Sequence, residues 1–427
     1  MYFKYEDENL LWHKINLNNI CESIEKELSE NYRYIGPYYL YHEDILKKRI
    51  EIINLALPKS NFYFSVKSLS NLQILKKIRK YPRFGLDVVS EGEILRGILA
   101  GFQGSEMVFA GVGKTKNEIL LALEKNLKSI HVESIQELKA IASLAISIKK
   151  TAPIGLRVNP DIPVDTHEYI ITGMDENKFG LSNSELKEAL NIIKESSSLE
   201  LKGFHMHLGS QIREVNPYIK ALSNLINLAD EINSIWEKPI DYLSLGGGFG
   251  IDYESIFEDK KKGFPIEELE KVDIFRNCKY QIDFEPGRFI SGYSGILIAK
   301  TLYIKEKNNF KIAITNAGMN DLLRPALYKA IHPVLPLIRK ENAEYTYDFV
   351  GPVCESADFL AKRVTSTKVE QNDRIAVLHC GAYGSVMGSN YNSRPMAPEF
   401  IIEDEKPVLI RKPQSIKEML NLETDIK

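Results

Sequence analysis

The sequence contains few cysteines and no long hydrophobic run. Its four cysteines lie far apart, at Cys21, Cys278, Cys354 and Cys380, and form no C-x-x-C pair. Such usage argues against a zinc knuckle or a disulfide framework and is typical of the reducing cytoplasm. No apolar stretch approaches the ~20 residues that would span a bilayer, and the acidic N-terminus lacks the apolar core of a signal peptide. We therefore expect a cytoplasmic protein without a membrane partner.

The sequence also lacks an excess of positive charge. Its 55 Lys and Arg residues against 58 Asp and Glu residues leave a net charge of −3, so no basic surface for nucleic acid is expected. Hydrophobic residues at 44% and charged residues at 26% are ordinary for a globular protein. A length of 427 residues suggests two domains with a sizeable core.

Strand-like runs alternate with amphipathic helical patterns through the first two thirds of the chain. The runs are 62–66, 84–89, 107–110, 129–132, 154–158, 203–208, 242–245 and 280–284. This alternation over about 250 residues predicts a (β/α)8 barrel, with a doubly wound open sheet as the alternative. Polar residues follow most of these runs, which favours the barrel, because there the strand ends converge on one face.

The pattern changes after residue 288, where strand-like runs follow one another without long helices. We therefore expect a (β/α)8 barrel over residues 35–288 and an all-β domain over residues 289–427. Residues 1–34 are expected to pack on the β domain.

Two glycine-containing segments resemble nucleotide-binding motifs but do not complete them. The segment 110–115 has Val108 where a P-loop needs its first glycine, and the segment 246–250 has Ile251 where a dinucleotide fingerprint needs its last one. Consecutive glycines at 246–248 can still form a nest of backbone N–H groups for a phosphate. A plain tight turn is the alternative.

Lys67 stands at the end of the first predicted barrel strand. Burial there would lower the pKa of its amine and favour its use as a nucleophile. The alternative is an ordinary lysine whose stem lies on the core while its head reaches water. His205 and His207 fall on one face of their strand, but no carboxylate spacing completes a zinc site, so no metal is expected.

Residues at the predicted strand ends supply an amine, an anion nest, a flat ring and a carboxylate. In that order they are Lys67, Gly246–Gly248, His207 and Glu285. These are the groups that pyridoxal phosphate needs around its aldehyde, phosphate, ring face and pyridine nitrogen. A structural ion pair between Glu285 and Arg288 is the alternative for the carboxylate.

Two residues of the second domain carry further chemistry. A Gly-Pro turn presents Cys354 beside acidic residues, where its thiol could act as a proton donor. Arg324, in Arg-Pro-Ala-Leu-Tyr, offers a guanidinium fork for a carboxylate.

From about Pro37 to Glu399 the sequence resembles the barrel-type pyridoxal-phosphate decarboxylases of basic amino acids, and most closely the diaminopimelate decarboxylases. The resemblance is carried by Ser65-Val66-Lys67, Gly85 to Glu93, Arg157-Val158-Asn159-Pro160, Thr172-Gly173, Lys178-Phe179-Gly180, His207 to Gln211, Gly246 to Gly250, Glu285-Pro286-Gly287-Arg288, Cys354-Glu355-Ser356 and Tyr391-Asn392. The order of these motifs makes the match specific.

The resemblance implies that Lys67 anchors pyridoxal 5′-phosphate, that His207 stacks on its ring and that Glu285 binds its pyridine nitrogen. The other implied cofactor contacts are Asp87, Ser210, Gly246, Gly247, Gly248, Gly287, Arg288 and Tyr391. Cys354 would act catalytically from the partner subunit of a head-to-tail homodimer. The residues that match substrate-binding places are Arg288, Arg324, Tyr328, Glu355 and Tyr391.

The resemblance implies decarboxylation of meso-2,6-diaminopimelate to L-lysine, the last step of lysine biosynthesis. Arg324 favours this substrate, because ornithine and arginine have no distal carboxylate. The alternative is a decarboxylase of another diamino acid, of the ornithine, lysine, arginine or carboxynorspermidine type. An alanine-racemase-like enzyme is disfavoured by Glu285, and a non-catalytic homologue by the joint presence of Lys67, Glu285 and Cys354.

Overall fold

The computed structural model describes residues 2–159, 179–236, 238–256, 263–340 and 343–424. The chain divides into two compact units. The barrel unit comprises Glu51–Ile251 and Gly263–Phe289. The β unit comprises Met1–Ile50, Asp252–Lys262 and Ile290–Lys427.

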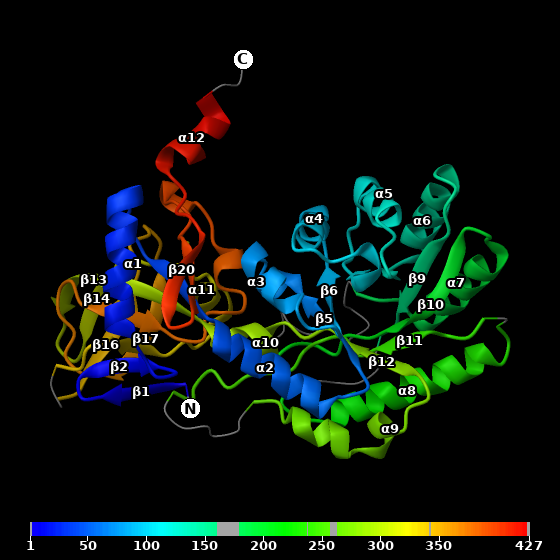
Figure 1. The fold of residues 1–427 in the computed structure, drawn as a ribbon, viewed down its shortest axis with the longest axis horizontal. Helices are drawn as coiled ribbons and strands as arrows, with labels where there is room; N and C mark the ends of the chain where they lie inside the picture. The colour runs from blue at the N-terminus through cyan, green and yellow to red at the C-terminus, as the bar shows by residue number, and fades with distance from the viewer. Residues whose placement is uncertain (1, 160–178, 237, 257–262, 341–342, 425–427) are drawn as a thin grey trace. The chain divides into compact units, whose positions relative to one another are not determined.

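Eight parallel strands of the barrel unit close in the order β10-β11-β12-β5-β6-β7-β8-β9 (Figure 1). Their bounds are β5 Asn61–Ser65, β6 Phe84–Val88, β7 Met107–Phe109, β8 Ser129–Val132, β9 Ala152–Arg157, β10 Leu199–His205, β11 Tyr242–Ser244 and β12 Gln281–Phe284. Each overlaps a run expected from the sequence. The pairing of β12 with β5 closes the ring and excludes the open sheet, so the prediction of a (β/α)8 barrel is confirmed.

The interior of this barrel is polar. On β12, Asp283 alternates with the apolar residues on either side, as expected when one strand face contacts helices and the other lines the barrel. The Tyr242 hydroxyl on β11 donates to Ser129 Oγ across the barrel at 2.7 Å. Gly155 on β9 leaves room for that hydroxyl, because a Cβ there would lie 2.5 Å from its oxygen. Close packing inside the barrel thus explains a glycine within a strand.

Helices cover the outside of the barrel strands (Figure 1). Their bounds are α3 Leu72–Ile78, α4 Glu91–Leu99, α5 Lys116–Glu124, α6 Ile135–Ser147, α7 Asn183–Glu195, α8 Asn216–Asn233 and α9 Asp273–Arg276. Four of them begin at a Ser or Thr that accepts from the backbone N–H of a Glu three residues on, namely Ser90, Thr115, Ser134 and Ser182. These caps satisfy the first N–H groups and set where the helices start.

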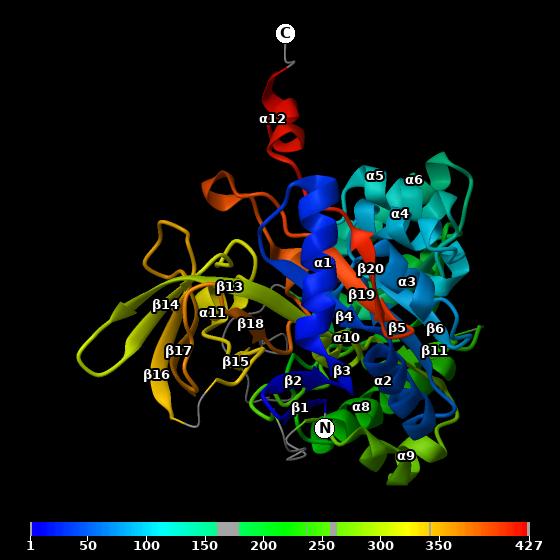
Figure 2. The same cartoon turned by 60° about the vertical axis from the view of Figure 1, so that its left-hand side comes forward.

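A nine-stranded sheet forms most of the β unit. Its main path is β17-β16-β14-β13-β4-β19-β20, with β18 pairing with both β13 and β15. The bounds are β4 Tyr38–His42, β13 Gly295–Glu306, β14 Lys311–Thr315, β15 Val334–Pro336, β16 Tyr345–Val350, β17 Phe359–Ser366, β18 Arg374–Val377, β19 Glu399–Glu403 and β20 Lys406–Arg411. Figure 2 shows β13 as the long strand of this sheet.

The expectation that residues 35–50 begin the barrel is wrong. All five residues of β4 are buried, and the strand pairs with β13 and β19 in the β-unit sheet. A short buried aromatic strand is equally suited to the barrel and to the β-unit sheet. Its hydrophobic pattern therefore could not show which of the two it joins. Helix α2 (Glu43–Ala56) follows β4 directly.

The N-terminal segment belongs to the same unit as the C-terminal strands. The strands β1 (Phe3–Glu6), β2 (Asn9–Trp12) and β3 (Ile15–Asn16) form a small antiparallel sheet, followed by α1 (Leu17–Tyr32). Trp12 of β2 and Leu40 of β4 lie in one buried core. The unit also contains α11 (Arg324–Tyr328) and α12 (Ile416–Thr424), so it is mostly β rather than all-β.

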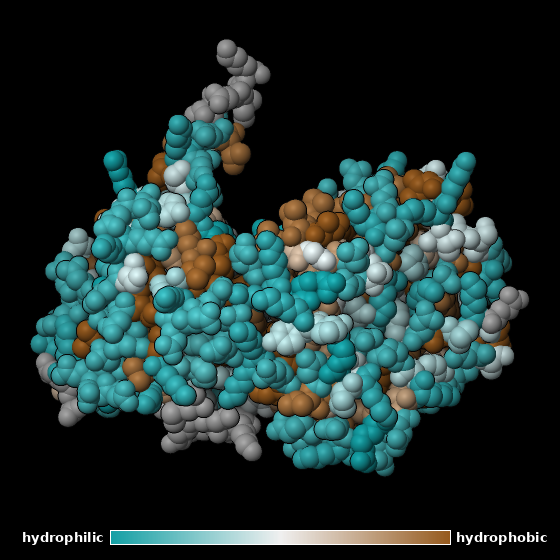
Figure 3. All heavy atoms as spheres, in the orientation of Figure 1, coloured by the Kyte–Doolittle hydropathy of each residue, from teal (hydrophilic) through white to brown (hydrophobic). Residues whose placement is uncertain are grey.

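The face drawn in Figure 3 is mainly polar, with a small hydrophobic area over α4. Leu95 and Leu99 of that helix are 41% and 67% exposed. Exposed leucines of this kind are ordinary on a protein surface. Within the described ranges, no helix is both long and apolar enough to cross a bilayer.

Candidate active site

The barrel-unit residues predicted to bind the cofactor lie at or just beyond the C-terminal ends of the strands. These positions are Lys67 after β5, Asp87 on β6, His207 and Ser210 after β10, Gly246–Gly248 after β11, and Glu285, Gly287 and Arg288 after β12. Parallel strands of a barrel end at one mouth. The contacts described next show that these residues do meet there.

Lys67 lies in a short 3₁₀ turn, Val66–Ser68, immediately after β5. Its Nζ is 3.4 Å from Oδ2 of Asp87, which is buried on β6 and also accepts a hydrogen bond from the Ser65 hydroxyl. Burial raises the pKa of Asp87 to about 6, and the nearby Lys67 charge opposes that rise. The side chain of Lys67 is 41% exposed, so its head reaches solvent, as one of the two interpretations of the sequence allowed. The turn carries the amine past the strand into the mouth.

The three glycines after β11 form a tight cradle. Gly246 and Gly248 have φ values of +65° and +99°, in the left-handed region that favours glycine. A Cβ on Gly247 would lie 2.3 Å from the carbonyl oxygen of Glu285. The Tyr218 hydroxyl on α8 donates to the Gly247 carbonyl at 2.7 Å and fixes the loop. Backbone amides without side chains are suited to hold a phosphate.

His207 contacts this cradle through its ring. Its Nδ1 accepts a hydrogen bond from the Gly247 N–H at 3.2 Å, so Nδ1 carries no proton. Loss of solvent around the ring, followed by the Lys67 charge, holds the pKa of His207 well below its usual value. The side chain is therefore a neutral, flat ring beside an anion cradle.

Glu285 is buried at the end of β12, at 4% exposure. Its Oε1 accepts from the Ser244 hydroxyl at 2.9 Å, and its Oε2 lies 3.0 Å from Nε2 of His205. Burial lowers the pKa of His205 well below its usual value. A neutral His205 donates from Nε2 to Glu285, so two neutral donors hold the carboxylate while leaving its charge in place.

A second layer orients these donors. The His131 ring stacks on that of His205, with centroids 4.4 Å apart, and Nε2 of His131 is 3.1 Å from the Tyr242 hydroxyl.

Arg288 and Ser210 also meet at the barrel mouth, where Arg288 Nη2 donates to the Ser210 hydroxyl at 3.1 Å. His131 and Ser244 were missed in the sequence, although both occupy inward positions of barrel strands that strict alternation could have identified.

In the β unit, Cys354 lies exposed in the loop between β16 and β17. Its backbone N–H donates to Oδ1 of Asn392, next to Tyr391. Asp358 holds this loop in place, because its carboxylate accepts hydrogen bonds from the backbone N–H groups of Val353 and Met319, each at 2.6 Å. Asp358 itself is buried.

Arg324 and the predicted substrate residues Tyr328, Glu355 and Tyr391 also belong to the β unit, whereas Arg288 belongs to the barrel unit. Arg324 is buried on α11, with Nη1 2.7 Å from Nε2 of His332 and its guanidinium 4.6 Å from the Tyr253 ring centre. Because His332 Nδ1 must donate to the Leu378 carbonyl at 2.8 Å, Nε2 is the acceptor for Arg324. Tyr328 is partly buried and Glu355 is exposed.

The motif residues Pro160, Thr172, Gly173 and Lys178 lie outside the described residues. Among the residues of the barrel mouth, the groups fit pyridoxal phosphate. The glycine cradle has no room for a Cβ, the Glu285 carboxylate is held by neighbouring hydrogen-bond donors, and the Lys67 amine projects beyond its strand. Lys67, Gly246–Gly248 and Glu285 would hold the cofactor's aldehyde, phosphate and ring nitrogen.

Comparison with known proteins gives concordant matches. The chain matches the family described as pyridoxal-dependent decarboxylase, pyridoxal binding domain, over residues 43–292. It is 36% identical over 428 residues to diaminopimelate decarboxylase of Aquifex aeolicus, covering 100% of this chain and 98% of the relative. It is 38% identical over 428 residues to that of Haemophilus influenzae, covering 100% of both. The crystal structure of diaminopimelate decarboxylase from Helicobacter pylori complexed with L-lysine has a TM-score of 0.86 at 37% identity, covering 93% of this chain and 98% of that chain.

Proposed function

Because this chain belongs to the pyridoxal-dependent decarboxylases, and within them to the diaminopimelate decarboxylases, we propose that it releases CO2 from meso-2,6-diaminopimelate and forms L-lysine. The observation that carries the proposal is full-length similarity to such enzymes, joined to the strand-end groups of the barrel. The four free cysteines fit our proposal that the enzyme acts in the cytoplasm, in lysine biosynthesis.

The barrel unit supplies the groups that hold the cofactor. Pyridoxal phosphate, when bound, supplies an electron sink for the carbon that loses CO2. Lys67 presents the amine at the mouth, with Asp87 as its counter-charge. Glu285 would hold a proton at the ring nitrogen, because its carboxylate is buried and kept in place by Ser244 and His205. His207 would lie against the ring face.

The β unit supplies the groups that act on the substrate. The Cys354 thiol would return a proton to the carbon that loses its carboxyl group. Arg324 would bind the distal carboxylate, and Glu355 the distal ammonium group. Tyr328 and Tyr391 would also contact the substrate, as would Arg288 of the barrel unit. His332 and Tyr253 hold the Arg324 guanidinium, so that its orientation is set before substrate arrives.

A panel of amino acids tests the substrate. Wild-type enzyme should release CO2 from meso-diaminopimelate with a kcat/KM at least about 100-fold above that for L-lysine, L-ornithine or L-arginine, because these lack the carboxylate that Arg324 would bind. Arg324→Gln should lower kcat/KM for diaminopimelate by about 100-fold, since a charged pair is lost. Release of CO2 from labelled substrates is the measurement.

Arg339→Gln is the matched control, because Arg339 also belongs to the β unit and lies 4.2 Å from a tyrosine ring centre. It should leave kcat/KM unchanged. Melting curves separate a loss of fold from a loss of recognition, since Arg324 is buried. Equal turnover of ornithine and diaminopimelate by wild type would contradict the substrate, and racemisation without CO2 release would contradict the reaction.

Subunit mixing tests the proposed homodimer. If Cys354 acts in the partner's site, Lys67→Ala and Cys354→Ala chains are each nearly inactive, yet a 1:1 mixture should recover about a quarter of wild-type activity. Half of the randomly paired dimers then have one intact site of their two. Activity is measured after mixing and re-equilibration, with each variant alone as control. No recovery in a mixture shown to contain mixed dimers would place both residues in the same chain's site.

A further inference from the structure

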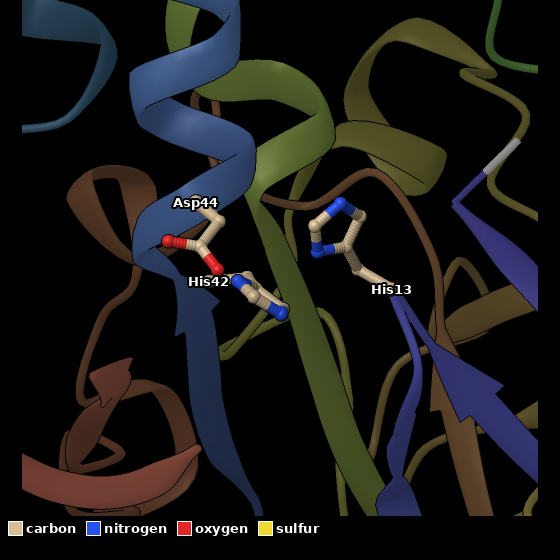
Figure 4. A group of neighbouring side chains, drawn as sticks. All are labelled: His13, His42 and Asp44. Carbon is tan, nitrogen blue, oxygen red and sulfur yellow. The ribbon is translucent and has the colours of Figure 1, made fainter. Parts of the chain in front are cut away.

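A cluster of two histidines and an aspartate, residue types that can bind a metal ion, lies in the β unit on residues that the proposed reaction does not use. It consists of His13, His42 and Asp44, whose donor atoms all lie within 4.8 Å of one another. Figure 4 shows the His13 and Asp44 side chains directed towards His42. His13 follows β2, His42 ends β4 and Asp44 stands in the first turn of α2.

His42 supplies an independent reason to expect a ligand. The side chain is buried, at 2% exposure, and neither ring nitrogen has a hydrogen-bond partner among the described residues. The ring is held edge-on between Trp12 and His13, with centroids 5.2 and 5.1 Å away. A buried imidazole without partners is costly, so a group that binds one of its nitrogens would stabilise the fold.

We propose that His13, His42 and Asp44 bind one Zn²⁺ ion, with a water as the fourth ligand. Two imidazoles and a carboxylate are a common zinc donor set. In a tetrahedral site with bonds of ~2.0 Å, donor atoms lie roughly 3.3 Å apart, so these side chains need only a small inward shift. His13 is partly exposed and Asp44 exposed, which lets both move without repacking the core.

The ion would join separate elements of the β unit. His13 lies in the β2–β3 hairpin, with φ of +47° followed by +77° at Lys14, a turn that fixes where its ring is presented. The other two ligands bracket the junction of β4 and α2. Zinc would thus tie the N-terminal sheet to β4, an inner strand of the larger sheet. The positive charge of Lys47, whose Nζ lies 3.9 Å from the Asp44 carboxylate, would weaken the binding of a cation at this site.

Titration of the full-length, cofactor-loaded enzyme with Zn²⁺ tests the site by calorimetry and by the melting temperature. Wild type should bind one equivalent and melt at a higher temperature with zinc. His13→Ala and Asp44→Asn should each weaken binding by at least about tenfold, because a ligand is lost, and should abolish the thermal shift. The Lys47→Ala control should bind zinc as tightly as wild type or more tightly, because it removes only the opposing charge.

Mg²⁺ serves as the metal control, because it prefers oxygen ligands and should not compete. Failure of wild type to bind Zn²⁺ would overturn the site and leave His42 with an ordered water. Binding that survives in both His13→Ala and Asp44→Asn would also overturn it and assign the ion elsewhere, for example to the His131, His205 and Glu285 cluster of the barrel unit. Neither result bears on the decarboxylation.

Discussion

Lys67→Ala is expected to lower kcat by at least about a thousandfold, because the variant has no amine at this position. That amine would bind the cofactor covalently before each turnover and again after product release. The exposed position of Lys67 beyond β5 means that the change leaves no cavity in the core, so the melting temperature should change little. The measurements are CO2 release and the mass of the Lys67 peptide after borohydride reduction, which should carry the cofactor only in wild type.

The control for this variant is Lys76→Ala, an exposed lysine of α3 that should retain full activity. Wild-type turnover in cofactor-loaded Lys67→Ala would contradict the assignment of Lys67. Added small amines should partly restore activity if only the amine is missing, since the rest of the mouth is intact.

Glu285→Gln is expected to lower kcat by about 10²- to 10³-fold, the usual effect of removing one preorganised electrostatic group. The amide has nearly the same shape but no charge, so it cannot hold a proton at the cofactor's ring nitrogen. Cofactor content, measured by absorbance, should remain close to wild type because the glycine cradle is unchanged. Steady-state kinetics should show the loss in kcat rather than in KM.

Ser244→Ala is the matched variant for Glu285. It removes one hydrogen-bond donor, 2.9 Å from the Glu285 carboxylate, but keeps the carboxylate's charge. It should therefore lower kcat by only about tenfold and should shift the pH profile of kcat. Wild-type kcat in Glu285→Gln, or an equal loss in the two variants, would contradict the role given to the carboxylate's charge.

The positions of the proposed cofactor-binding residues agree with the expectation from the sequence more closely than the domain limits do. Lys67, Gly246–Gly248 and Glu285 all follow barrel strands as expected, because period-2 alternation and the turns after each strand are local properties. The expected barrel limit at residue 35 included β4, which instead pairs within the β-unit sheet. Which sheet a buried aromatic strand joins depends on partners hundreds of residues away.

The sequence also could not predict which of these polar side chains are buried. The sequence alone did not show that Asp358 is buried and accepts hydrogen bonds from two backbone N–H groups. The sequence left open whether the Lys67 amine is buried or reaches water, and the turn after β5 exposes it. In both cases the local sequence is compatible with a buried or an exposed side chain. Segments of the same chain that pack nearby decide which of the two occurs.

The sequence by itself determined the order of strands and helices and indicated the cofactor, because these depend on side-chain type and short-range spacing. It also predicted the residues that we propose hold the cofactor. Only the tertiary structure decided how Glu285 is held by His205 and Ser244, and how His13, His42 and Asp44 come together. Such groupings depend on barrel closure and on sheet pairing between distant segments, which local pattern does not encode.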